Sequence, residues 1–172
     1  MTRDREVHAE PELVPATEAH VRELMSWFCD AESCALWGGP AFRFPFTEAT
    51  FREDARWGKM PALALVDPGG ALLAFGQFYL RAGRCQLARL AVSPARRRQG
   101  LGARLVRGLA EEGCRRLTVE ECSLFVAAAN EPAVRLYRRL GFVEAPLPAD
   151  ETAFEGAAYM IVPLGTITAS EG

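Results

Sequence analysis

The chain of 172 residues has little lysine, histidine or paired cysteine: one lysine, two histidines and five cysteines without a C-x-x-C pair. The odd number and irregular spacing of Cys29, Cys34, Cys85, Cys114 and Cys122 argue against a disulfide framework and against a structural zinc site. Cysteine is also often buried simply as a small hydrophobic residue. We therefore expect these side chains to pack in the core, and we expect no metal.

Long apolar segments and a large net charge are also missing. The uncharged stretch Pro68–Leu80 has 13 residues, whereas a membrane-spanning helix needs about 20. The charged N-terminus Met1–Glu6 has no apolar segment behind it, unlike a secretory signal. A net charge of −2 and a pI near 5.8 provide no basic field for nucleic acid or an anionic membrane. We expect a cytoplasmic protein with neither of these partners.

The remaining composition, 49% hydrophobic and 24% charged, is typical of one globular domain. We expect a single domain over 1–172 with flexible ends at 1–10 and 165–172. Apolar spacing and turn residues predict strands at 13–16, 62–67, 71–79, 84–92, 123–127, 142–145 and 158–164, and helices at 18–28, 47–57, about 102–116 and 132–140. The aromatic segment 37–46 is predicted to form a loop. This order of elements indicates an α/β fold with a mixed sheet.

An arginine- and glycine-rich turn joins the strand that ends near Pro94 to the helix after Gly102. Unpaired N–H groups at a helix start attract anions, and glycines let a phosphate approach the backbone closely. A nucleotide P-loop would need a lysine in this turn, and a dinucleotide fingerprint would need glycine at Leu105. The turn therefore predicts an anion site of another kind.

A second pattern, N-x-x-A-x-x-x-Y-x-x-x-G-F, runs from Asn130 to Phe142 and starts 28 residues after Gly102. Together with R-x-x-G-x-G at Arg97–Gly102, it resembles the GCN5-related N-acetyltransferase (GNAT) superfamily. The flanking elements are similar to that family from about residue 13 to 164. The resemblance implies a mixed, mostly antiparallel twisted sheet with splayed central strands and about four helices.

The resemblance also implies acetyl-CoA as a co-substrate and a set of residues that would hold it. In such proteins the pantetheine arm lies between the splayed strands and the pyrophosphate lies on the glycine-rich turn. The implied cofactor-binding residues are Leu90, Ala91, Val92, Arg97, Arg98, Gln99, Gly100, Leu101, Gly102, Ala103, Asn130, Ala133 and Tyr137. The carboxamide of Asn130 can donate and accept at once, as an amide ligand requires.

Tyr137 resembles the general acid of the family. The implied reaction is direct attack of a primary amine on the thioester, in which a phenol with a pKa near 10 protonates the leaving thiolate. The acceptor would be an amine-bearing small molecule or a peptide. The general base is open: Glu120 and Glu121 are weak candidates, and Phe125 stands where some relatives carry a glutamate.

The acceptor side is equally open. Trp37, Phe42, Phe44 and Phe46 come from the region that covers the acceptor site in the family, and packing onto the core explains them at least as well. Arg43 is either a ligand for an acceptor carboxylate or an ordinary surface arginine.

Two other functions stay possible at the level of the sequence. One is a catalytically silent acyl-CoA-binding regulatory domain, which an intact Asn130 and Tyr137 disfavour. The other is a nucleic-acid binder that uses Arg96–Arg98, Arg104 and Arg107. The chain is expected to be a monomer or a homodimer.

Overall fold

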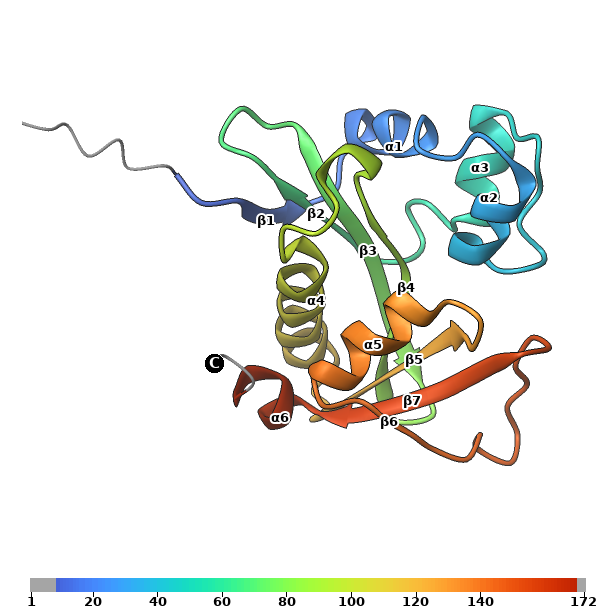
Figure 1. The fold of residues 1–172 in the computed structure, drawn as a ribbon, viewed down its shortest axis with the longest axis vertical. Helices are drawn as coiled ribbons and strands as arrows, with labels where there is room; N and C mark the ends of the chain where they lie inside the picture. The colour runs from blue at the N-terminus through green and yellow to red at the C-terminus, as the bar shows by residue number, and fades with distance from the viewer. Residues whose placement is uncertain (1–8, 170–172) are drawn as a thin grey trace, which may run out of the picture.

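The computed structural model describes residues 9–169, which form a seven-stranded twisted sheet flanked by helices (Figure 1). The strands are β1 (Glu12–Pro15), β2 (Ala62–Val66), β3 (Leu72–Arg81), β4 (Arg84–Val92), β5 (Glu121–Ala127), β6 (Val143–Glu144) and β7 (Ala157–Pro163). Their spatial order is β1-β2-β3-β4-β5-β7-β6, and only the β4–β5 pair is parallel. The predicted fold class, a mixed and mostly antiparallel sheet, is confirmed. The expected flexible end at 1–10 falls mainly on residues 1–8, outside the described range.

The described residues also form six α-helices and one 3₁₀ turn, more than the four helices expected. The helices are α1 (Glu18–Met25), α2 (Ala31–Gly38), α3 (Glu48–Asp54), α4 (Leu101–Leu117), α5 (Glu131–Arg139) and α6 (Leu164–Ala169), and the 3₁₀ turn is Pro94–Arg96. Helices α1–α3 gather near one end of β3 and β4, and α4 lies along the sheet (Figure 1). In this described part of the chain, no helix is both long and apolar enough to cross a membrane.

Each face of the sheet carries its own core, because successive strand residues point to opposite sides. In β2, Leu63 and Leu65 join the cluster under α4, α5 and α6, whereas Ala64 and Val66 join the cluster under α1–α3. The helices therefore sandwich the sheet. The loops that leave one end of β4 and β5 come to lie between these two groups of helices.

Two helices were missed in the sequence. Residues 31–38, of which 37–38 were expected to be loop, form α2, and its one buried side chain is Cys34, so no apolar stripe marks it. Its cap was readable, since Asp30 Oδ1 accepts a 2.7 Å hydrogen bond from the N–H of Ser33. The expected flexible end at 165–172 begins instead with α6, where Ile167 is fully buried.

The parallel pair β4–β5 is short, and this positions the site. Pairing runs only from Cys85, Gln86 and Leu87 to Cys122, Ser123 and Leu124. Beyond these residues the two strands separate, so the second half of β4 has no strand on its β5 side. The backbone groups of β4 are left exposed to whatever fills the gap.

Candidate active site

Two cavities open in and around the gap between β4 and β5. The larger has a volume of about 760 Å³ and the smaller about 320 Å³. Both are lined by Leu36, Trp37, Leu90, Asn130, Ala133 and Tyr137. The cavities therefore meet where the strands part, and a molecule in one can contact a molecule in the other.

The larger cavity contains the predicted anion-binding turn. Gly100 is the N-cap of α4 with a left-handed φ of +74°, a conformation that costs glycine little. A Cβ added at Gly102 would lie 3.0 Å from Leu136 Cδ2, so glycine lets α4 and α5 approach. Arg97 and Arg98 stand in the same wall. The N–H groups of the first turn of a 17-residue helix and two guanidinium groups make this end attractive to a pyrophosphate.

All the sequence-predicted cofactor residues except one line this cavity. The exception is Gln99, whose Oε1 accepts a 3.3 Å hydrogen bond from Nε of Arg96 on the outside of the turn. Asn130 lines the cavity and also caps α5, because its Oδ1 accepts from the N–H of Ala133 at 3.4 Å. Capping leaves the predicted ligand role possible, since the side-chain NH₂ can still donate to a ligand.

Tyr137 lies on α5, which points it into the region shared by both cavities. The residue is 8% exposed and its ring packs against Phe142 at a centroid distance of 5.7 Å. Burial raises the pKa of Tyr137 to about 12, because the phenolate would lose its hydration. The hydroxyl is therefore protonated throughout the physiological range.

The two glutamates considered as general bases lie outside both cavities. Glu120 and Glu121 are at the start of β5, and neither lines either cavity. Glu121 faces Arg84, with 3.3 Å between its Oε2 and the arginine Nε. Phe125, four residues after Glu121 on β5, lines the smaller cavity instead, and its ring is tilted against that of Tyr159 at a centroid distance of 5.1 Å. The site does not use these glutamates as wall residues.

The smaller cavity has an aromatic and cationic wall that the sequence did not reveal. Arg56 and Met60 contribute to it from the loop before β2, Tyr79 from β3, Arg89 from β4 and Phe154 from the loop before β7. The sequence did hold one signal: Arg89 stands between the apolar residues Ala88 and Leu90 in a predicted strand. The strand is irregular there, because its register against β3 shifts and Arg89 has a φ of +51°.

The four aromatic residues of the segment expected near the acceptor site pack mainly on the core. Phe42 is buried, and Phe44 and Phe46 lie half-buried against the same cluster. Trp37 stacks on Phe28 and Phe51 and also lines both cavities. Its Nε1 donates a 2.8 Å hydrogen bond to the carbonyl oxygen of Arg89, which ties α2 to the irregular part of β4.

Arg43, which was a candidate ligand for a carboxylate of the acceptor, forms ion pairs within the protein instead. Its guanidinium forms hydrogen bonds with both carboxylate oxygens of Asp54 and with Glu53. It lines neither cavity. The ordinary-surface interpretation of Arg43 therefore fits the structure better.

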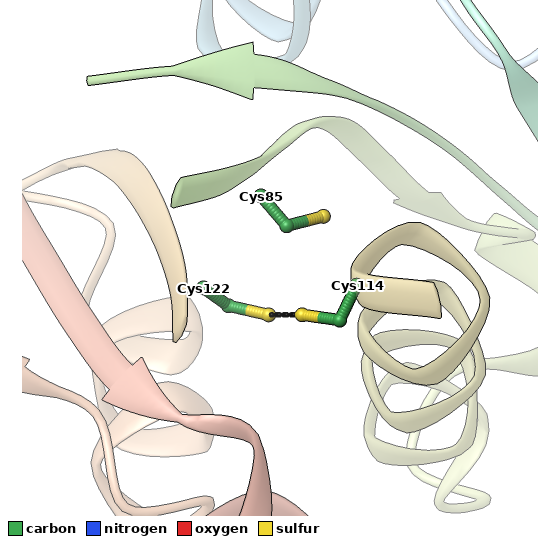
Figure 2. A group of neighbouring side chains, drawn as sticks. All are labelled: Cys85, Cys114 and Cys122. Carbon is green, nitrogen blue, oxygen red and sulfur yellow. Dashed lines mark hydrogen bonds between the residues drawn. The ribbon is translucent and has the colours of Figure 1, made fainter. Parts of the chain in front are cut away.

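All five cysteines lie in the described range and are free thiols. Cys85 of β4, Cys114 of α4 and Cys122 of β5 form a buried group where these elements meet, with 3.4 Å between the sulfurs of Cys114 and Cys122 (Figure 2). The three sulfurs lie within 4.8 Å of one another. Their neighbours are apolar core residues such as Phe78 and Leu87. The expected burial as small hydrophobic residues is observed for these three and for Cys34, but it is wrong for Cys29, which is exposed.

Comparison with known proteins agrees with this geometry. Residues 21–142 match the family described as "Acetyltransferase (GNAT) family". A mycothiol acetyltransferase of Clavibacter michiganensis is 40% identical over 88 residues, which cover 49% of this chain but only 28% of that protein. The ribosomal protein bS18-alanine N-acetyltransferase of Escherichia coli K12 is 34% identical over 107 residues, 62% of this chain and 70% of the relative.

Among solved structures, the spermidine N-acetyltransferase of Vibrio cholerae in complex with CoA and spermine superposes with a TM-score of 0.69. The match covers 92% of this chain and 98% of that one, at 16% sequence identity. At this identity the similarity concerns the fold.

Proposed function

The chain belongs to the GNAT family of acetyltransferases, and from this premise we propose that it is an N-acetyltransferase that moves an acetyl group from acetyl-CoA to a primary amine of a peptide or small molecule. The observation that carries the proposal is the meeting of the two cavities at Leu90, Asn130 and Tyr137 in the gap between β4 and β5. One cavity suits the CoA molecule and the other suits the amine.

The walls of the larger cavity fit the parts of CoA in order. The turn from Arg97 to Ala103 would hold the pyrophosphate with backbone N–H groups and arginines. The free edge of β4 from Leu90 to Val92 would pair with the pantetheine amides as an added strand does. Asn130 would donate to the carbonyl of one of those amides from the opposite side.

In the reaction, the amine nitrogen forms a bond to the thioester carbon and the carbonyl oxygen becomes an oxyanion. A backbone N–H near Leu90–Val92 would stabilise that charge. The carbon–sulfur bond then breaks, the thiolate takes the proton of the Tyr137 hydroxyl, and the proton lost by the nitrogen passes to water. The phenolate recovers a proton from solvent. Tyr137 suits this role because it keeps its proton at the pH of the reaction.

The experiment is thiol release from acetyl-CoA over a panel of amines and peptides, with Tyr137→Phe beside the unmodified chain. We expect the variant to lose about 10²–10⁴-fold in kcat, the usual contribution of a positioned acid, because phenylalanine keeps the packing but has no proton to give. Tyr159→Phe is the matched control: Tyr159 is buried on β7, outside both cavities, and should keep full activity.

CoA should raise the melting temperature of the chain and of both variants, since binding to the folded state alone stabilises it. Absence of both turnover and thermal stabilisation would contradict the proposed function. Full activity of Tyr137→Phe would contradict the role of Tyr137 alone.

A further inference from the structure

The charges around the two cavities are all of one sign. In the described range, no aspartate or glutamate lines either cavity, whereas arginines line both. Arg56 and Arg89 belong to the smaller cavity, on the side away from the glycine-rich turn. A pocket for a polyamine would need carboxylates along its length, and this pocket offers guanidinium groups instead.

Arg89 is half-buried and its direct partners carry no formal charge. Nη1 donates to Gln77 Oε1 at 3.1 Å and to the sulfur of Met60 at 3.6 Å, and Nη2 donates to the backbone oxygen of Asp54 at 3.1 Å. Since a guanidinium has five N–H donors, these bonds leave the Nε–H, which is a buried atom without a partner, and one Nη2–H. The Nε atom is shielded from solvent, so of these two groups the Nη2–H is the one left for a ligand.

The carboxylate of Asp54 makes no direct bond to Arg89. Both of its oxygens are held by Arg43, so Asp54 meets Arg89 through its backbone oxygen and through a weaker attraction of charges across space. Burial accordingly lowers the pKa of the Arg89 guanidinium from its ordinary value. Arg56, exposed at the same cavity, adds a second positive charge close enough to repel the first. A buried charge is costly unless it is paired, and a ligand carboxylate would supply the missing pair.

We propose that the acceptor is a primary amine that also carries a carboxylate, and that Arg89 and Arg56 are the residues that select it. This inference rests on the proposed function, because it names the class of amine that the acetyl group reaches. A guanidinium N–H forms a charge-assisted hydrogen bond with a carboxylate, and the second guanidinium adds attraction at a distance. The cavity of about 320 Å³ suits an amino acid or the first residues of a peptide. By the same charges, a polycation such as spermidine is disfavoured.

The same arrangement helps the chemistry. Because no carboxylate base lines the cavity, the acceptor amine must already be in its neutral form when it binds. A peptide α-amine has a pKa of about 7.7–8.0, whereas a lysine-like amine has about 10.4, so the former is far more often neutral near pH 7.5. Nearby guanidinium groups disfavour the ammonium form further. A peptide α-amine with a carboxylate on a neighbouring side chain therefore fits both the charge of the cavity and the absence of a base.

The test uses bisubstrate analogues, in which the CoA sulfur is joined through an acetyl linker to the nitrogen of an acceptor, so that binding is measured without turnover. In the first pair of analogues the acceptor is alanine, with a carboxylate, or alaninamide, without one. In the second pair it is the dipeptide amide Ala-Glu, with a side-chain carboxylate, or Ala-Gln amide, without one. Spermidine is the cationic probe. We expect at least one carboxylate analogue to bind about tenfold or more tightly than its neutral partner, and the spermidine analogue to bind most weakly. The first pair reports a free amino acid and the second an acidic peptide.

Variants then assign the preference to residues. Arg56→Gln, at an exposed position, should reduce the carboxylate-to-neutral ratio several-fold, and Arg89→Met should reduce it further if its melting temperature shows that it folds. Arg115→Gln is the control, since this exposed arginine lies on α4 outside both cavities and pairs with Glu112. A ratio of one or less in both pairs, or tighter binding of the spermidine analogue, would overturn the inference and leave the proposed function standing. Failure of every analogue and of CoA itself to bind would count against the proposed function.

Discussion

At the scale of single residues, environment changes what a side chain can do. Tyr137 is an ordinary tyrosine in the sequence, but burial between α5 and the sheet raises its pKa to about 12. The shift favours the neutral acid, because the folded chain cannot hydrate the phenolate. Arg89 shows the same cause with the opposite sign, because for a guanidinium the charged form is the protonated one.

The shift at Tyr137 predicts the pH profile of the reaction. As pH rises, kcat/KM should increase while the acceptor amine loses its proton, and Tyr137 should cause no decline below about pH 11, since its pKa is near 12. The measurement is initial thiol release between pH 6 and 10.5, with uncatalysed thioester hydrolysis subtracted. A descending limb near pH 9 that disappears in Tyr137→Phe would contradict the raised pKa.

At the scale of elements, the close approach of α4 to the sheet depends on small residues. A Cβ added at Gly113 would lie 2.5 Å from the sulfur of Cys85 and 3.1 Å from the ring of Phe78. These neighbours are fully buried, so they have little room to move. The sulfur group in Figure 2 therefore exists because α4 presents a glycine and a cysteine to β4 and β5.

Gly113→Ala tests this packing. Overpacking costs about 1–3 kcal/mol and the better helix propensity of alanine returns up to about 1 kcal/mol, so we expect a net loss of about 1–2 kcal/mol in the free energy of unfolding. Gly165→Ala, where no atom lies within 4 Å of the added Cβ, is the matched control and should not destabilise. Urea unfolding of the three proteins measures the difference. Equal midpoints would show that the sheet and α4 can separate without cost.

At the scale of the whole molecule, two cores on opposite faces of one sheet bury four of the five cysteines. Cys34 lies in the core under α1–α3, and Cys85, Cys114 and Cys122 lie in the core under α4, while Cys29 is exposed. Thiol reactivity therefore reports the integrity of both faces at once, because a buried thiol reacts only when its core opens.

This distribution predicts the outcome of thiol labelling. With a bulky disulfide reagent, the native chain should react rapidly at one thiol, and all five should react in denaturant. Cys29→Ser should abolish the rapid reaction without changing the melting temperature, and mass spectrometry of peptides assigns the label. Rapid labelling of Cys85, Cys114 or Cys122 in the folded chain would contradict the packed core.

Much of the fold and part of the candidate site could be predicted from the sequence, because local physics sets them. Periodic spacing and turn residues placed the strands and four helices of the described range, and the glycine-rich turn predicted an anion site. The roles of Asn130 and Tyr137 came from the resemblance to the GNAT family, whose motif lies within one stretch of chain. The two missed helices have a local cause as well. Helices α2 and α6 each bury one side chain, so neither shows the apolar stripe by which a helix is predicted from sequence.

Only the tertiary structure determined which residues from distant parts of the chain face one another in the site. Contacts between segments far apart in the chain set the short β4–β5 pairing and the meeting of the two cavities at Tyr137. Such contacts also bring Arg56 and Arg89 to one cavity wall and leave Glu120 and Glu121 outside both cavities. Spacing along a chain reports periodicity and turns, which are local. The charge that a substrate meets is the sum over side chains brought together by packing, and for that reason only the folded chain reveals it.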